Sequence, residues 1–174
     1  MVDNPVFYRK TLTGAAYRSW LHSMGVKYVL LPGTRLDPVS APAESKLLRS
    51  GRAGLIVAFR GTTGTIYELP RASRLLTGPG PARLTTLSHA TIAGRITSPG
   101  RYLLRVHYNP HWALHATGVC LQATSGGMTE LNVTIPGSFK LTDAPGIDVF
   151  LSSLLRNHTH VCDTTQKRPI DRPG

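Results

Sequence analysis

Two spacings of apolar residues organise the start of the chain. Residues 14–24 repeat apolar positions at helical intervals, which predicts a helix that Thr13 caps and Gly25 ends. The largely apolar runs at 26–31 and 55–60 predict strands, and the second of them is expected to be buried. The beginning of the chain is therefore predicted to mix α and β structure.

A short helix and a hairpin complete this predicted unit. The helix is expected at about 43–49, after Pro42 and before Gly51. A Gly-Thr-Thr-Gly turn at 61–64 leads into a strand at 65–69, which is typical of a hairpin. The resulting order, α-β-α-β-β, predicts a small α/β subdomain over residues 1–70.

The pattern changes after a segment rich in proline and glycine. Residues 71–81 are predicted to be a linker. Short apolar segments then follow at regular intervals, separated by turns that contain Gly, Pro or Asn. They predict strands at 83–87, 91–97, 102–108, 112–116, 120–123, 129–135 and 138–142. This spacing indicates an antiparallel β-sandwich of jelly-roll or immunoglobulin-like type over 82–143, so the predicted fold class is α+β.

The last segment, 144–174, carries less pattern. Residues 149–155 are apolar enough for one short amphipathic helix. The polar residues from 156 to 174 are expected to form a mobile tail.

Composition bounds the class of protein. The chain has 174 residues, of which 41% are hydrophobic and 17% are charged. That is enough apolar material for one domain or two small ones, and too little charge for a coiled coil or a charge-driven disordered chain. No run of eighteen apolar residues occurs, so no membrane span is expected.

The charge favours an anionic partner. Twenty Lys and Arg against nine Asp and Glu give a net charge of +11. Candidate partners are anionic lipid headgroups, a phosphate-bearing substrate or nucleic acid. The basic residues are spread singly, with no run longer than two, which disfavours nucleic acid.

The two cysteines, Cys120 and Cys162, permit one disulfide. Such a bridge would fasten the C-terminal tail to a strand and would suit an oxidising compartment. Two unrelated thiols in a cytosolic protein are the alternative. The first five residues lack the basic start and apolar middle of a signal peptide, so we expect export to need a segment that this sequence does not contain.

The sequence offers no catalytic constellation. His111 and His115 are four residues apart, but in a strand-like region without an accompanying acid, so no metal site is predicted. No Gly-x-Ser-x-Gly elbow occurs, and Glu44, Glu68 and Glu130 are each expected to be exposed. We expect no catalytic residue, no cofactor and no enzymatic activity.

One turn combines residues suited to sugar binding. Tyr108, His111 and Trp112 flank Asn109-Pro110, and aromatic planes stack on the apolar faces of sugars. The competing interpretation, which the strand pattern favours, places Trp112 in the sandwich core with Tyr108 beside it. Exposed aromatic side chains would support the first interpretation, and a fully buried Trp112 would support the second.

The order of motifs over residues 4–142 resembles that of large actinobacterial integral membrane proteins. These are multi-spanning (GT-C-like) glycosyltransferase-like proteins that use polyprenyl-phosphate sugars. The resemblance rests on Tyr17-Arg18-Ser19-Trp20-Leu21, Gly25-Val26-Lys27-Tyr28-Val29, Ile66-Tyr67-Glu68-Leu69, Gly78-Pro79, Pro99-Gly100-Arg101-Tyr102, Tyr108 to Trp112, Cys120 and Gly126-Gly127.

This resemblance implies a C-terminal extracytoplasmic (periplasmic) domain, without the membrane part that carries the catalytic acids. The implied function is a non-catalytic accessory role in cell-envelope polysaccharide assembly. The implied partners are a glycan or polyprenyl-phosphate sugar, the membrane-embedded glycosyltransferase segment, and an anionic membrane surface. Two alternatives stay open: a structural or protein-interaction module without sugar affinity, and a basic nucleic-acid-binding domain.

Overall fold

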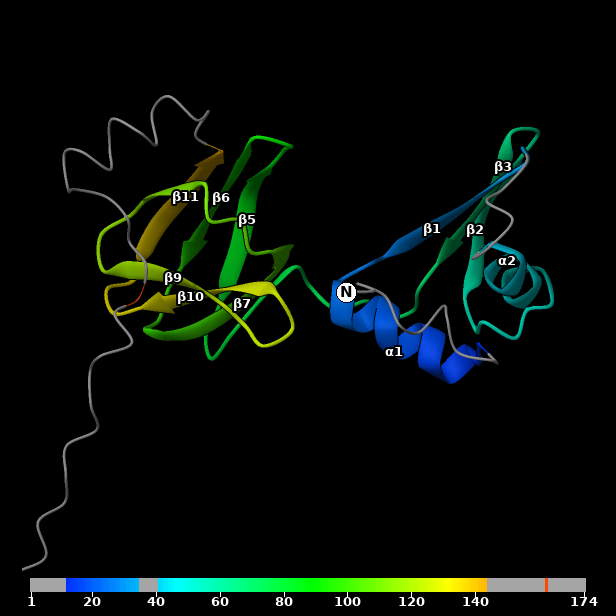
Figure 1. Ribbon diagram of the computed structural model, residues 1–174, viewed down its shortest axis with the longest axis horizontal. Helices are drawn as coiled ribbons and strands as arrows, with labels where there is room; N and C mark the ends of the chain where they lie inside the picture. The colour runs from blue at the N-terminus through cyan, green and yellow to red at the C-terminus, as the bar shows by residue number, and fades with distance from the viewer. Residues whose placement is uncertain (1–11, 35–40, 144–161, 163–174) are drawn as a thin grey trace, which may run out of the picture. The chain divides into compact units, whose positions relative to one another are not determined.

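The chain folds into two compact units, which Figure 1 shows. The computed structural model describes residues 12–34, 41–143 and 162. The N-terminal unit ends at Leu75 and the C-terminal unit begins at Leu76, within the segment 71–81 that was predicted as a linker. The described structure consists mainly of antiparallel sheets with two helices.

The N-terminal unit has the predicted order α-β-α-β-β. Its strands form one antiparallel sheet in the order β1-β3-β2, with β2 and β3 joined as the expected hairpin. The elements are α1 (Gly14–Met24), β1 (Tyr28–Pro32), α2 (Ala41–Arg49), β2 (Ile56–Gly61) and β3 (Gly64–Glu68).

Local chemistry sets the ends of α1. The Thr13 hydroxyl accepts a hydrogen bond from the Ala16 amide at 3.2 Å, which satisfies one of the free N–H groups of the first turn. Gly25 adopts a left-handed conformation (φ 68°), and its amide donates to the His22 carbonyl at 3.2 Å. Both caps were predicted from sequence, and the helix has the predicted bounds.

The two helices cover one face of this sheet. The buried cluster joins residues of both helices to inward-facing strand residues: Tyr17, Leu21, Leu31, Leu47, Leu48, Ala53, Tyr67 and Leu69. Side chains alternate between the faces of a strand, so residues adjacent to Leu31 and Tyr67 point the other way.

The strand predicted at 55–60 is present as β2, but the prediction that it is buried was wrong. All six residues of β2 are exposed. The strand lies at the edge of the three-stranded sheet, and among the residues described in this unit (12–34 and 41–75) no second layer covers the face opposite the helices. An apolar run thus marked a strand correctly but did not fix its burial.

The C-terminal unit contains two four-stranded antiparallel sheets, ordered β4-β7-β10-β9 and β5-β6-β11-β8. All seven predicted strands are present; β4, two residues within the predicted linker, was missed. The strands are β4 (Leu76–Thr77), β5 (Ala82–Leu87), β6 (Thr91–Ile96), β7 (Gly100–His107), β8 (Trp112–His115), β9 (Val119–Ala123), β10 (Met128–Val133) and β11 (Gly137–Asp143).

One apolar interior joins these two sheets. Tyr102, Leu104 and Leu131 from the first sheet belong to the same buried cluster as Phe139 and Leu141 from the second. Burial of a large apolar side chain contributes about 1.5–3 kcal/mol, so this shared core is the main source of stability for the unit. The arrangement is sandwich-like.

Several predictions concern residues that the structure does not describe. The helix at 149–155 and the mobile tail at 156–174 lie outside the described residues, apart from Cys162. In the described ranges, neither helix has the length and apolar character needed to cross a membrane.

Candidate functional site

The predicted aromatic turn connects β7 to β8 and is held by local hydrogen bonds. The Tyr108 amide donates to the Gly127 carbonyl at 2.8 Å. The Asn109 side-chain oxygen accepts from the His111 amide at 2.9 Å, and the Asn109 carbonyl accepts from the Trp112 amide at 3.1 Å. An Asx turn of this kind fixes the backbone that carries all three predicted residues.

The three side chains of the turn differ in exposure. His111 is exposed, whereas Tyr108 and Trp112 are half-buried and pack against the sandwich core. Trp112 has the same strand parity as Leu114, which is buried, and the Trp112 Nε1 is buried without a hydrogen-bond partner among the described residues. Trp112 is therefore neither exposed nor fully buried, so the turn's role in sugar binding stays a prediction.

Cys120 and Cys162 form a disulfide, with their Cα atoms 5.0 Å apart. The Cys162 amide also donates to the Leu121 carbonyl at 3.1 Å, beside β9. Of the two alternatives that the sequence left open, the structure therefore has the bridge. A disulfide of this kind is compatible with an oxidising, extracytoplasmic compartment.

A basic groove lies on the outer face of the β5-β6-β11-β8 sheet, with a volume of about 360 Å³. The strand register brings its cations together: Arg83 pairs with Arg95, and Lys140 pairs with His115. The groove is lined by Arg83, Thr85, Ala93, Gly94, Arg95, His115, Ser138, Phe139 and Lys140. We call this set the basic groove.

The electrostatics of the basic groove are one-sided. Arg83, Arg95 and Lys140 are exposed, and no carboxylate is among the lining residues. Thr85 is the extra residue of a β-bulge between Leu84 and Thr86, and bulges redirect side chains. Three cations next to Ser and Thr hydroxyls form a surface suited to phosphate or carboxylate oxygens.

The basic groove was not predicted from the sequence. Its three cations are far apart in the chain, and each one is an isolated basic residue. The alternation of side chains along a strand could have shown part of it. Arg95 lies two residues from Ala93, and Lys140 lies two residues from Ser138, so each pair is on one face of its strand. Parity within a strand does not reveal which strands are neighbours, so only the register could assemble the groove.

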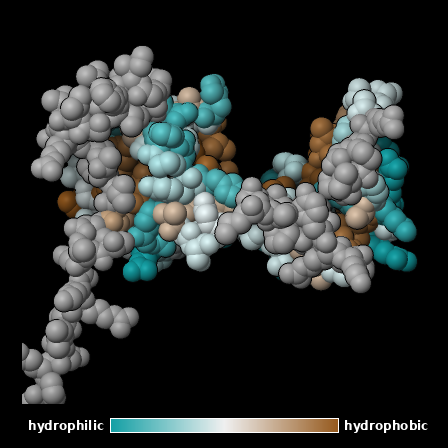
Figure 2. All heavy atoms as spheres, in the orientation of Figure 1, coloured by the Kyte–Doolittle hydropathy of each residue, from teal (hydrophilic) through white to brown (hydrophobic). Residues whose placement is uncertain are grey.

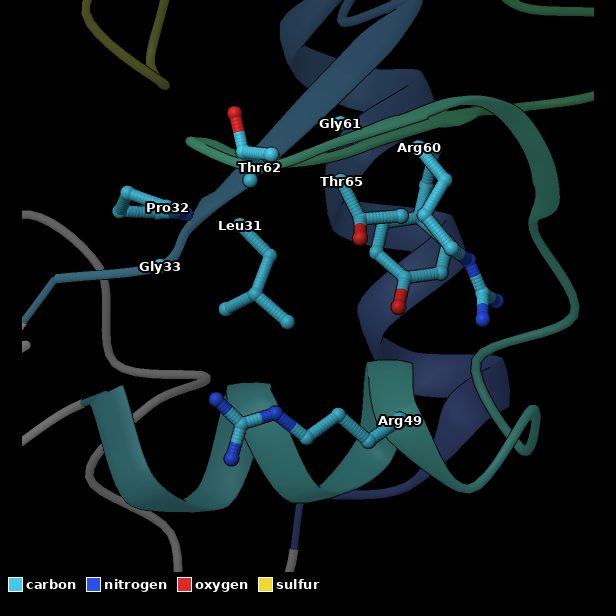
Figure 3. Close-up of a pocket in the computed structure, with 10 residues that line it drawn as sticks. Leu31, Pro32, Gly33, Arg49, Arg60, Gly61, Thr62 and Thr65 are labelled. Atoms are coloured by element: carbon cyan, nitrogen blue, oxygen red, sulfur yellow. The ribbon is translucent and has the colours of Figure 1, made fainter.

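The N-terminal unit has a second open pocket, of about 320 Å³. Figure 3 shows Arg49, on α2, across the pocket from Thr65 and Arg60 on the sheet. Arg49 lies in the last turn of α2, where a cation offsets the negative end of the helix dipole. Helix stabilisation accounts for Arg49, so this pocket is the weaker candidate site.

The described residues contain no candidate metal centre. Within them, no group of three or more His, Cys, Asp or Glu side chains is placed to hold a metal ion. The prediction that the three glutamates are exposed was wrong, because Glu44, Glu68 and Glu130 are all half-buried. Glu44 accepts a hydrogen bond from Tyr17, and Glu130 accepts one from Gln122. These bonds give both carboxylates a structural role.

Comparisons of the whole chain with protein-family models, with curated proteins and with solved structures found no match. The resemblance to membrane glycosyltransferase-like proteins is therefore carried only by the motifs quoted above. It enters the functional argument as a proposal.

Proposed function

We propose that this chain is a non-catalytic, extracytoplasmic accessory domain that binds anionic glycan, and that the basic groove is its binding surface. The observation that carries the proposal is the convergence of Arg83, Arg95 and Lys140 on one sheet face without a carboxylate among the lining residues. The resemblance to glycosyltransferase-like proteins supports the substrate class, and the disulfide supports the compartment.

The chemistry of the groove favours a charged, extended ligand. Guanidinium groups bind phosphate and carboxylate through paired hydrogen bonds, and neighbouring hydroxyls can bind sugar hydroxyls. The groove is an open surface on a sheet, so it suits an oligosaccharide laid across the strands better than a small enclosed molecule. Phosphate- or uronate-bearing sugars fit both requirements.

The predicted residues Tyr108, His111 and Trp112 have a secondary place in this proposal. Tyr108 and His111 lie in the turn before β8, and Trp112 begins β8, the strand that also contributes His115 to the basic groove. His111 is exposed and is available to a neutral sugar next to a charged one.

We also propose that the C-terminal unit has a jelly-roll or immunoglobulin-like topology. Its eight described strands, arranged in two antiparallel sheets, support this proposal.

Binding of a phosphorylated mannan oligosaccharide, compared with its dephosphorylated form, tests the proposal. We expect isothermal titration calorimetry to detect millimolar or tighter binding of the phosphorylated form only. Arg95→Gln combined with Lys140→Gln should weaken this binding at least tenfold. Arg49→Gln combined with Arg60→Gln removes the same charge from the N-terminal unit and should leave it unchanged.

Two results would contradict the proposal. If both double variants lose affinity equally, the interaction is a nonspecific effect of net charge. If neither oligosaccharide binds, the groove is not a glycan site, and the alternative of a structural or protein-interaction module is favoured.

A further inference from the structure

The sheet of the N-terminal unit exposes an apolar face. The strand register forms two cross-strand rows: Tyr28, Glu68 and Ile56 form one, and Leu30, Ile66 and Phe59 the other. Four of these side chains are largely exposed, with Tyr28 at 52%, Leu30 at 63%, Ile56 at 61% and Phe59 at 59%. We call Tyr28, Leu30, Ile56, Phe59 and Ile66 the apolar sheet face; hydrophobic surface over this sheet is visible in Figure 2.

This exposure is built into the strands. Leu31, the next residue after Leu30, is buried against the helices. A β-bulge between Val57 and Phe59 places Phe59 on the same face as Ile56, although the two residues are three apart. A Cβ at Gly61 would lie 2.8 Å from the Phe59 ring, so the ring reaches over this glycine. The face follows from the register, which also places Glu68 between Tyr28 and Ile56.

Positive charge predominates in the described part of the unit that carries the apolar sheet face. Lys27 precedes β1 with its Nζ 4.8 Å from the centre of the Tyr28 ring, whereas Arg60, which follows Phe59 in β2, lies on the other side of the sheet in the pocket that Arg49 also lines. The carboxylate in the rows, Glu68, is 3.6 Å from Lys27 Nζ. The described part of the unit carries eight cations, Arg18, Lys27, Lys46, Arg49, Arg52, Arg60, Arg71 and Arg74, against two acids, Glu44 and Glu68.

We propose that the apolar sheet face docks onto the surface of an anionic phospholipid bilayer. Apolar side chains would enter the boundary between headgroups and acyl chains, while Lys27 stays at the level of the phosphates. Basic side chains near such a surface are attracted by its negative potential. This inference concerns a different surface from the basic groove and does not depend on glycan binding.

The observations favour a bilayer over a second copy of this chain. Five side chains, about half-exposed, offer on the order of 500 Å² of apolar surface, which is large for an exposed patch. A standard protein interface needs roughly 800 Å² from each partner. A second copy would also bring the same excess of cations, whereas an anionic bilayer supplies the opposite charge and needs no shape complementarity.

Co-sedimentation of the full chain with vesicles tests this proposal. We expect binding to phosphatidylcholine vesicles that contain phosphatidylglycerol, and little binding to phosphatidylcholine alone. Leu30→Ser combined with Phe59→Ser should lower the partition coefficient at least tenfold. Leu87→Ser combined with Ile135→Ser makes a comparable change at two exposed apolar residues of the C-terminal unit and should have no effect.

Further measurements separate this proposal from its rivals. Lys27→Gln alters no apolar residue and should weaken both lipid binding and the salt dependence of that binding. Circular dichroism should show that each variant is folded. Lipid binding that the Leu30 and Phe59 substitutions leave unchanged would overturn the proposal, because it would be purely electrostatic. Absence of lipid binding would also overturn the proposal. If analytical ultracentrifugation then shows a dimer, and the Leu30 and Phe59 substitutions abolish it, the face binds a second copy of the chain. The Arg95 and Lys140 variants test glycan binding separately.

Discussion

The hydroxyl of Tyr17, in α1, donates a hydrogen bond to Oε1 of Glu44, in α2, and so links the two helices of the N-terminal unit. Tyr17 is fully buried, and its ring stacks on Trp20 with the ring centres 6.1 Å apart. Burial and the bond to Glu44 hold the pKa of Tyr17 well above its ordinary value of 10.0.

This raised pKa predicts a loss of stability in alkali. Below pH 10 the hydroxyl is protonated in both the folded and the unfolded chain, so its contribution is fully present. Above pH 10 only the unfolded chain releases the proton, and the free energy of unfolding falls by about 1.4 kcal/mol per pH unit. Urea unfolding at several pH values, compared between the wild type and Tyr17→Phe, measures this; parallel pH curves would contradict it.

The same bond predicts a cost at neutral pH. Tyr17→Phe keeps the ring and its packing but removes the donor to Glu44, which should destabilise the N-terminal unit by about 1.5–3 kcal/mol. Trp20 fluorescence in a Trp112→Phe background reports unfolding of this unit. Tyr28→Phe removes an exposed hydroxyl from the same unit and should change the free energy of unfolding by less than about 0.5 kcal/mol.

The disulfide predicts a redox-dependent stability of the C-terminal unit. Cys120 and Cys162 are 42 residues apart, and closing a loop of that length restricts the unfolded chain by about 4 kcal/mol. Reductant should therefore lower the urea midpoint seen by Trp112 fluorescence in a Trp20→Phe background. The Cys120→Ser/Cys162→Ser variant should start at the lower midpoint and not respond to reductant; a response there would mean that reductant acts elsewhere.

Trp112 predicts a sharp difference between two substitutions. Its Nε1 is buried without a partner among the described residues, so Trp112→Phe loses no hydrogen bond in them and should cost less than about 1.5 kcal/mol. Trp112→Ala removes the packing against the core and should cost about 3 kcal/mol or more. Thermal unfolding followed by circular dichroism distinguishes the two, and equal costs would show that the indole nitrogen has a role of its own.

Salt dependence tests the charge of the basic groove. Raising the ionic strength from about 0.01 M to 1 M shortens the screening length from roughly 30 to 3 Å, so binding of a phosphorylated oligosaccharide should weaken steeply. The Arg95→Gln/Lys140→Gln variant should show a smaller slope of affinity against salt. Equal slopes would mean that these two cations do not contact the ligand.

The parts of the fold that local chemistry controls were predicted from sequence. The bounds of α1 follow from a Thr13 cap and a left-handed Gly25, and both act within a few residues. The strands of the C-terminal unit follow from two-residue alternation between turns. β4 was missed because a two-residue strand is too short to show alternation, and its pairing with β7 is a tertiary contact.

The sequence alone determined which segments are helix or strand, β4 excepted, the excess of positive charge, and the two thiols able to form one bridge. The tertiary structure decided what those segments cover and which distant residues meet. It left β2 exposed because that strand is at a sheet edge, and it brought Arg83, Arg95 and Lys140 to one surface through strand register. The physical reason is that periodicity reports the face of a strand, whereas burial and site formation depend on the neighbours that strand acquires on folding.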